Sequence, residues 1–133
     1  MLKNLVLICI GASLGAISRW GLGVLLNGLH PFIPVGTLAV NVIGSYLLGI
    51  FFGLVSLVPN LGPEWRLLIV TGFLGSLTTF SSFSGEVGIL LQQQRYIWAM
   101  GLVTMHVAGS LFALFLGIGF VRLVVYCGNF FIK

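Results

Sequence analysis

The sequence has very little charge. Lys and Arg number 6, Asp and Glu number 2, and together they make up 6% of the 133 residues, whereas an average soluble domain carries roughly 25%. This scarcity excludes an ordinary soluble domain, and the few dispersed positive charges do not form the basic patch of a nucleic-acid-binding protein. With 59% hydrophobic residues and a mean hydropathy of +1.18, the chain is predicted to be an integral membrane protein surrounded by lipid.

Cysteine and the signatures of enzymes are also scarce. The two cysteines, Cys9 and Cys127, lie in or beside apolar stretches at opposite ends of the chain. There a cysteine is expected to pack as a small hydrophobe rather than to form a disulfide or bind a metal. The sequence contains no glycine-rich nucleotide-binding loop and no nucleophile–base arrangement set on a soluble domain. We therefore expect neither an enzyme nor an energy-coupling domain.

Four long apolar runs occupy most of the chain, at about residues 5–26, 33–58, 67–91 and 97–126. Each is long enough to cross a bilayer, which takes ~20 residues of α-helix, and only short turns separate them. We therefore predict an all-α integral membrane protein with a single four-helix domain over residues 1–133. A cleavable signal peptide in the first run is the alternative, but apolar character continues past the candidate cleavage site and three more runs follow.

Glycine is abundant, at 19 residues of 133. Two pairs, Gly11/Gly15 and Gly49/Gly53, have the spacing that lets membrane helices pack closely, so we expect a tight bundle. The last run exceeds the length needed to span, and must tilt, bend near Gly117 and Gly119, or protrude from the membrane.

Four spans place both chain ends on one side of the membrane. The positive charges are then nearly balanced: Lys3, Arg66, Arg122 and Lys133 lie on that side, and Arg95 with Arg19 on the other. Because an excess of Lys and Arg in cytoplasmic loops orients a membrane protein, this near balance leads to the hypothesis that the chain inserts in both orientations.

The third run contains an unusually polar stretch, Gly75-Ser76-Leu77-Thr78-Thr79-Phe80-Ser81-Ser82-Phe83-Ser84. At ~1.5 Å per residue from Leu67, the stretch begins ~12 Å into the span, near the middle of the bilayer. Hydroxyls at that depth need a partner or a water-filled path, so they either join helices or line a conduit, and we favour the conduit. We expect the helix to break at Gly75 and free carbonyls for a cation; an unbroken helix with hydroxyls bonded to its own carbonyls is the alternative.

Aromatic and amide side chains indicate that the conduit carries an anion. Phe80 and Phe83 can turn the positive edges of their rings toward an anion, although core packing also explains them. Asn41 and Thr37 lie on a polar stripe of the second run, where the Asn41 amide either donates to an anion or bonds to another helix. Rings, amides and hydroxyls such as Ser81 would hold an anion weakly enough to release it.

The spans also contain a few charged or titratable residues. Arg19, near the far end of the first run, either reaches the membrane interface or attracts anions at the mouth of a polar cavity. His106 and Ser110 share a helix face in the fourth run, with His106 either a packing residue or a titrating site. Glu86 has no histidine or second acid near it in sequence, which argues against a proton relay.

The stretch Gly75 to Ser84, Asn41 and the motif Gly-Ala-Ser-Leu-Gly-Ala-Ile-Ser-Arg from Gly11 to Arg19 together resemble the bacterial fluoride channel family known as Fluc or CrcB. The resemblance extends over essentially the whole chain. It implies a fluoride-selective, passive export channel in the bacterial inner membrane, assembled as an antiparallel, dual-topology homodimer with two pores.

The resemblance also implies roles for individual residues. The ion pathway would contain Asn41, Phe80, Phe83, Ser110, Thr37 and Ser81, with Arg19 in the entrance vestibule. Gly75 and Thr78 would offer backbone carbonyls to a structural sodium ion at the dimer centre, on a third helix broken at mid-membrane. The fourth run departs from the hydroxyl-rich pattern expected of the family, at Leu102 and His106.

A small dual-topology, proton-coupled exporter of cationic compounds is the alternative function. Such an exporter needs a carboxylate embedded in the membrane, and Glu86 is the one candidate in this sequence. A non-transporting assembly subunit would explain the glycines but not the clustered hydroxyls.

Overall fold

The computed structural model describes residues 1–57 and 61–131, and every regular element within these ranges is helical. The elements in chain order are α1 (Leu2–Leu26), the 3₁₀ turn η1 (Asn27–Leu29), α2 (Val35–Leu57), α3 (Pro63–Trp65), the π-helical η2 (Arg66–Leu74), α4 (Gly75–Leu77), α5 (Phe80–Gln92) and α6 (Tyr96–Phe131). The predicted end of the second span, at residue 58, and Lys133 lie outside the described ranges.

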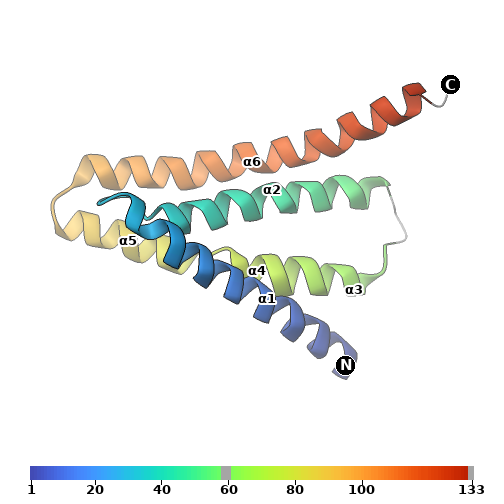
Figure 1. Ribbon diagram of the computed structural model, residues 1–133, viewed down its shortest axis with the longest axis horizontal. Helices are drawn as coiled ribbons and strands as arrows, with labels where there is room; N and C mark the ends of the chain where they lie inside the picture. Colours follow the sequence, from blue (N-terminus) through green and yellow to red (C-terminus); the bar gives the residue numbers. More distant parts are fainter. Residues whose placement is uncertain (58–60, 132–133) are drawn as a thin grey trace.

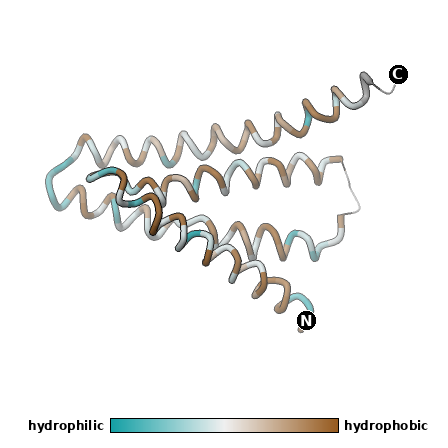
Figure 2. The backbone as a smooth tube through the Cα atoms, viewed as in Figure 1, coloured by the Kyte–Doolittle hydropathy of each residue, from teal (hydrophilic) through white to brown (hydrophobic). Residues whose placement is uncertain are grey.

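The described helices form four stretches that are long and apolar enough to cross a membrane: Leu2–Leu29, Val35–Leu57, Pro63–Gln92 and Tyr96–Gly128. The prediction of an all-α protein with four membrane-spanning helices is thereby confirmed. In Figure 1, α6 runs beside α2, α1 crosses α4, and the two chain ends lie at the same end of the bundle. Hydrophobic residues recur along the helices, and hydrophilic ones gather at the turn between α5 and α6 (Figure 2).

The glycine pairs that predicted close packing lie at helix contacts. A Cβ atom at Gly11 or Gly15 would overlap the backbone of η2, and one at Gly53 would press on a side chain of α6. Gly49 on α2 faces Gly117 on α6, and a Cβ atom at either would overlap a carbonyl oxygen of the opposite helix. Because only glycine lacks a Cβ atom, these positions hold α1 against η2, and α2 against α6, at backbone contact distance.

The third span is interrupted beyond α4. Helical backbone ends at Leu77 and resumes at Phe80, and between them Thr78 and Thr79 are extended, with ψ angles of 156° and 117°. Gly75 is helical, with φ −62° and ψ −29°, so the prediction of Gly75 as the break point was wrong. Threonine is β-branched and accepts extended backbone readily, whereas Gly75 simply continues the turn that η2 begins.

The fourth span is one long helix. α6 has 36 residues, which is ~54 Å at ~1.5 Å per residue, against a hydrocarbon core of ~30 Å. The helix continues through Gly117 without an interruption. Any bend at Gly117 therefore does not interrupt the hydrogen-bonded helix, and α6 is longer than the hydrocarbon core is thick.

Candidate ion pathway

The interruption of the third span is held by Asn41 on α2. The Thr79 amide donates to Asn41 Oδ1 at 2.7 Å, and Asn41 Nδ2 donates to the Thr79 carbonyl at 3.0 Å. One side chain thus satisfies both backbone groups of a residue that has left the helix, as a neighbouring strand would do. Asn41 Nδ2 also lies 3.0 Å from Nδ1 of His106 on α6. The Asn41 amide therefore ties α2, the break and α6 together.

Thr79 also caps the helix that follows the break. Its Oγ1 accepts from the Ser82 amide at 3.1 Å and donates to Ser82 Oγ at 3.0 Å, which is the pattern of an N-cap threonine on α5. Sequence reasoning gave Thr79 no role of its own. A threonine directly before a new helical segment is the N-cap signal that would have identified it.

A cavity of about 450 Å³ lies beside the break. We call it the phenylalanine cavity. It is lined by Asn41, Gly44, Ser45, Leu48, Val70, Leu74, Gly75, Thr78, Thr79, Phe80, Phe83, His106, Val107 and Ser110. None of these described lining residues is Lys, Arg, Asp or Glu, so the polar groups of the wall are amides, hydroxyls, an imidazole and backbone.

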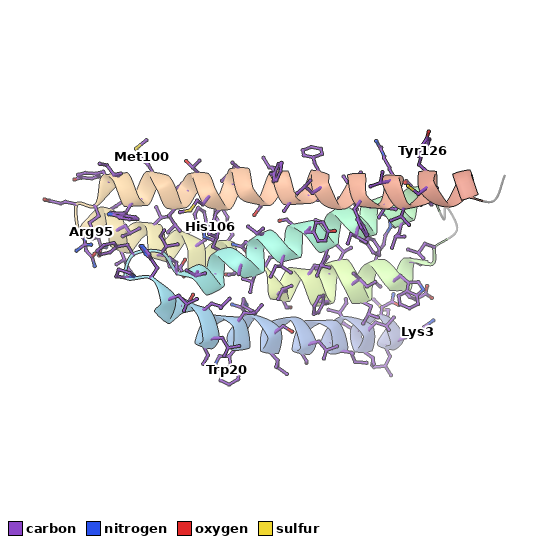
Figure 3. The ribbon with its side chains drawn as sticks, turned by 45° about the horizontal axis from the view of Figure 1, so that its top comes forward. Lys3, Trp20, Arg95, Met100, His106 and Tyr126 are labelled. Carbon is purple, nitrogen blue, oxygen red and sulfur yellow. The ribbon has the colours of Figure 1, made fainter. Side chains whose placement is uncertain are left out.

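The two phenylalanines that line this cavity differ in their exposure. Phe83 is buried, with 7% of its surface exposed, whereas Phe80 is 79% exposed. Their rings meet edge to face with centroids 5.5 Å apart. Phe83 also stacks on the imidazole of His106, with centroids 4.5 Å apart and the planes inclined by 30°. Figure 3 shows His106 on the side of α6 that faces the rest of the bundle.

A second cavity, of about 580 Å³, lies among α1, α2 and α5. We call it the arginine cavity. It is lined by Ala16, Arg19, Trp20, Gly23, Val24, Asn27, Gly36, Thr37, Val40, Thr79, Ser82 and Glu86. Arg19 Nε donates to the carbonyl of Ser76 in α4 at 3.0 Å. Arg19 therefore points into the bundle, whereas the neighbouring Trp20 points away from it (Figure 3), and the reading of Arg19 as a cavity residue fits better than extension to the interface.

Thr37 and Glu86 form a pair within the arginine cavity. Thr37 Oγ1 donates to Glu86 Oε1 at 2.6 Å, and Oε2 of the same carboxyl group is buried without a hydrogen-bond partner among the described residues. The sequence placed Thr37 on one polar stripe with Asn41, but Thr37 lines the arginine cavity and Asn41 lines the phenylalanine cavity. It named Glu86 only as the candidate carboxylate of the alternative exporter and did not pair it with Thr37, because a contact between residues 49 positions apart has no local signal.

The remaining predicted residues divide between the two cavities. Thr79 lies on the wall of both and so stands between them. The phenylalanine cavity contains Asn41, Phe80, Phe83 and Ser110, and the arginine cavity contains Thr37 and Arg19. Ser81 lines neither cavity; it is exposed, and its hydroxyl lies 3.3 Å from Thr79 Oγ1.

Gly75 and Thr78, the predicted ligands of a cation, both reach the phenylalanine cavity. In a continuous helix their carbonyls would bond to the amides of residues 79 and 82. Those amides donate elsewhere, to Asn41 Oδ1 and to Thr79 Oγ1, so both carbonyls have lost their regular helical partners. The described residues contain no cluster of three or more His, Cys, Asp or Glu.

Comparisons with known proteins show extensive similarity. Residues 6–118 match the family model described as "CrcB-like protein, Camphor Resistance (CrcB)". A "Fluoride-specific ion channel FluC" of Desulfovibrio desulfuricans is 52% identical over 127 residues, which cover 96% of this chain and 98% of that protein. Proteins with the same description are 54% identical in Pseudomonas syringae pv. maculicola, over 84% of this chain and 87% of the relative, and 53% identical in Tolumonas auensis, over 93% and 98%.

Proposed function

This chain belongs to the CrcB family, and we propose that it is a fluoride-selective passive channel whose pathway runs from the arginine cavity past Thr79 into the phenylalanine cavity. The relatives described as fluoride-specific channels support the choice of ion, because they match almost the whole chain. The four apolar helices and the bacterial relatives make it a multi-pass bacterial membrane protein. The function is transport, not catalysis.

The main support for this pathway is the uncharged wall of the phenylalanine cavity. A fixed positive charge would bind a small anion too tightly for rapid release, and conduction requires binding that is weak at each site. Ring edges, amide and hydroxyl groups supply partial positive charge instead. Phe80, Phe83, Asn41 and Ser110 provide such groups around one cavity.

The arginine cavity suits the entrance to this pathway. Arg19 uses its Nε to hold Ser76, and the other N–H groups of the guanidinium are available to attract anions from solution. Its charge lies outside the phenylalanine cavity. The charge of Arg19 would thus first concentrate anions in the arginine cavity. The anions would then pass Thr79 and enter the phenylalanine cavity, whose wall is uncharged.

We also propose that the channel is an antiparallel homodimer. Phe80 lines the pathway and yet is 79% exposed in the single chain, so the phenylalanine cavity lacks a wall on that side. A second copy packed against Phe80 would supply this wall and would separate the anion from lipid. Inversion of the second copy agrees with the nearly balanced positive charges of the two chain ends and turns.

Sodium is the cation we propose for the carbonyls of Gly75 and Thr78. Broken membrane helices commonly hold Na⁺ through carbonyls that have left the helical ladder, and both carbonyls have lost those partners. Two carbonyls from each of two copies would surround one ion. Dialysis of the purified dimer against sodium-free choline buffer should lower its midpoint of thermal unfolding, because an ion that binds only the folded dimer stabilises it. Equal midpoints in both buffers would contradict the site.

The physical setting explains why a passive channel suffices for export. Hydrogen fluoride is a weak acid that crosses lipid uncharged and dissociates in a less acidic cytoplasm, which traps fluoride. A membrane potential that is negative inside drives an anion outward at ~2.3 kcal/mol per 100 mV. An open anion pathway therefore lowers cytoplasmic fluoride without a coupled energy source.

Efflux from proteoliposomes tests the proposed function. Vesicles loaded with potassium fluoride and carrying the protein should lose fluoride rapidly once valinomycin dissipates the diffusion potential, whereas chloride-loaded vesicles should retain their anion. The fluoride flux should need no proton gradient. Absence of flux, or equal loss of chloride, would reject a fluoride-selective channel; proton-driven uptake of an organic cation would favour an exporter that uses Glu86.

A further inference from the structure

We propose that a groove on α6 binds one anionic glycerophospholipid, with an acyl chain in the groove and the phosphate on Arg122. The groove has a volume of about 510 Å³ and is lined by Tyr46 of α2 and by six residues of α6 between Phe112 and Leu123. We call it the α6 groove. Among the described residues it shares no lining residue with the phenylalanine cavity or the arginine cavity, so it is separate from the proposed ion pathway.

Gly119 leaves the space of the α6 groove open. A Cβ atom at Gly119 would meet no atom of the described residues within 4 Å, so this glycine, unlike Gly117, is not needed for close helix packing. The five larger side chains of α6 that line the groove are 50–67% exposed. The rings of Tyr46 and Phe120 lie with their centroids 6.5 Å apart. Apolar walls beside an open glycine give a hydrocarbon chain a place to pack.

The α6 groove lies on the opposite side of α6 from the phenylalanine cavity. Ser110 lines that cavity and Gly119 lines the groove, and their separation in sequence corresponds to ~2.5 helical turns. The second copy proposed above packs against Phe80, on the side of the phenylalanine cavity, and a two-fold dimer uses one self-complementary surface. The inference rests on this proposed homodimer, which leaves the α6 groove facing lipid.

The groove ends at the level of the membrane interface. α2 has 23 residues, which is ~35 Å of helix against a hydrocarbon core of ~30 Å. Val121 of α6 packs against Gly53, one turn before α2 ends at Leu57. Arg122 and Tyr126 therefore lie near the lipid head groups, where tyrosine is common. Both are exposed, and Tyr126 points away from the bundle (Figure 3).

Arg122 places a positive charge at this end of the groove. It follows Gly119 by three residues and Phe115 by seven, which are spacings at which helical side chains share a face. Its planar guanidinium can bond to two oxygens of one phosphate. An acyl chain that lies along Phe115 and Gly119 would thus bring its head group to Arg122.

No acidic side chain of this protein neutralises Arg122. The chain has 2 acidic residues. Glu64 pairs with Lys3 at 3.0 Å, and Glu86 lies in the arginine cavity among α1, α2 and α5. The phosphate of an anionic lipid is the counter-charge that the membrane offers at this depth, which favours an anionic over a zwitterionic lipid.

Native mass spectrometry of the purified full-length protein tests the site, because one spectrum counts both bound lipids and subunits. The protein in detergent is mixed with dioleoylphosphatidylglycerol or, at the same concentration, with dioleoylphosphatidylethanolamine. We expect one phosphatidylglycerol per chain, bound about fivefold more tightly than phosphatidylethanolamine, as a single arginine near an anionic head group predicts.

Variants of Arg122 test the head-group contact. Arg122→Gln should remove the preference for phosphatidylglycerol, whereas Arg122→Lys keeps the charge and should keep most of the preference. Arg66→Gln removes another exposed arginine, on the third span, and is the matched control that should bind both lipids like the parent. An unchanged preference in Arg122→Gln, or equal binding of the two lipids by the parent, would overturn the proposal.

Gly119→Leu tests the acyl-chain contact. The added side chain should fill the groove and lower the binding of both lipids roughly tenfold. Gly101→Leu is the control, because Gly101 lies five helical turns earlier on the same side of α6 and is also without a neighbour within 4 Å. Monomers of Gly119→Leu, with Gly101→Leu and the parent dimeric, would show that a second copy covers the groove and would overturn the proposal.

The comparison of Arg122→Gln with Arg66→Gln decides the matter by itself if Gly119→Leu fails to fold. The assay contains no fluoride and measures no flux, so a failure of the proposed channel function is recognised separately from a failure of this inference.

Discussion

At the scale of single residues, Asn41 links three parts of the structure. Its oxygen accepts from the backbone of the break, and its nitrogen donates to the same residue and to His106. The sequence left two readings of Asn41 open, an interhelical hydrogen bond and a donor to an anion. The observed contacts show the interhelical bond; they also place the amide on the wall of the phenylalanine cavity, where the second role stays a prediction.

Asn41→Asp should abolish fluoride efflux. The substitution replaces the donor nitrogen by a second oxygen, which can no longer donate to the Thr79 carbonyl or to His106 Nδ1. It also adds a negative charge, which repels an anion in the proposed pathway. Asn4→Asp, which makes the same chemical change at an exposed position, is the control and should conduct like the parent. Unchanged efflux in Asn41→Asp would exclude Asn41 from the pathway.

Phe83→Ile and Phe80→Ile test the role of the aromatic rings. Isoleucine keeps hydrophobic bulk but has no positive ring edge, so we expect fluoride efflux to fall about tenfold or more in each variant, as for other losses of an ion ligand. Phe112→Ile, at an exposed site on α6 away from this cavity, is the matched control. If all three variants conduct equally, the rings pack the protein and do not contact the ion.

At the scale of helices, glycine contacts and one interruption determine how the spans fit together. Close approach of α2 and α6 at Gly49 and Gly117 brings Asn41 and His106 within reach of each other, although 65 positions separate them in the sequence. The break at Thr78 and Thr79 then turns backbone groups toward these side chains. Helix packing thus brings together the residues that line the phenylalanine cavity.

Gly117→Ala should destabilise the protein even though alanine is the better helix former. The added Cβ atom would overlap the Tyr46 carbonyl on α2, and forced overpacking of this kind costs roughly 1–3 kcal/mol. Gly101→Ala on the same helix is the control, because a Cβ atom there meets no neighbour within 4 Å. Thermal unfolding in detergent should show a lower midpoint for Gly117→Ala alone, and equal midpoints would contradict close packing at this site.

At the scale of the whole molecule, the four spans place both chain ends at the same end of the bundle (Figure 1) and leave Phe80 exposed at an open side of the phenylalanine cavity. A single copy therefore does not enclose the phenylalanine cavity. The homodimer and its inverted arrangement stay proposals that this open face and the balanced charge support.

Thiol labelling in cells tests the inverted arrangement. The variant carries Cys9→Ala, Cys127→Ala and Asn4→Cys, so that its one thiol lies near the N-terminus. If Lys and Arg do not impose one orientation, a membrane-impermeant reagent should modify roughly half of the chains from outside. The other chains should react only after the membrane is permeabilised. Arg95→Gln, which lowers the positive charge of the opposite turn, should shift the ratio. Modification of all chains or of none from outside would establish one orientation and reject the antiparallel dimer.

The sequence by itself determined that this is a four-helix membrane protein, because hydropathy and span length are local properties that lipid selects directly. It also located the polar stretch of the third span and the residues that resemble a fluoride channel. Those features need no knowledge of which helices touch.

Only the tertiary structure decided where the third helix breaks, how the predicted residues divide between two cavities, and which side chain of α2 contacts His106. Each depends on hydrogen bonds across long separations, 38 positions from Asn41 to Thr79 and 65 from Asn41 to His106. Gly75 is the residue type at which a helix is expected to break. The helix instead ends next to Thr79, whose backbone amide donates to Asn41 on α2. In a membrane the chain leaves the helix where another side chain replaces the lost hydrogen bonds, and that place is a property of packing rather than of local sequence.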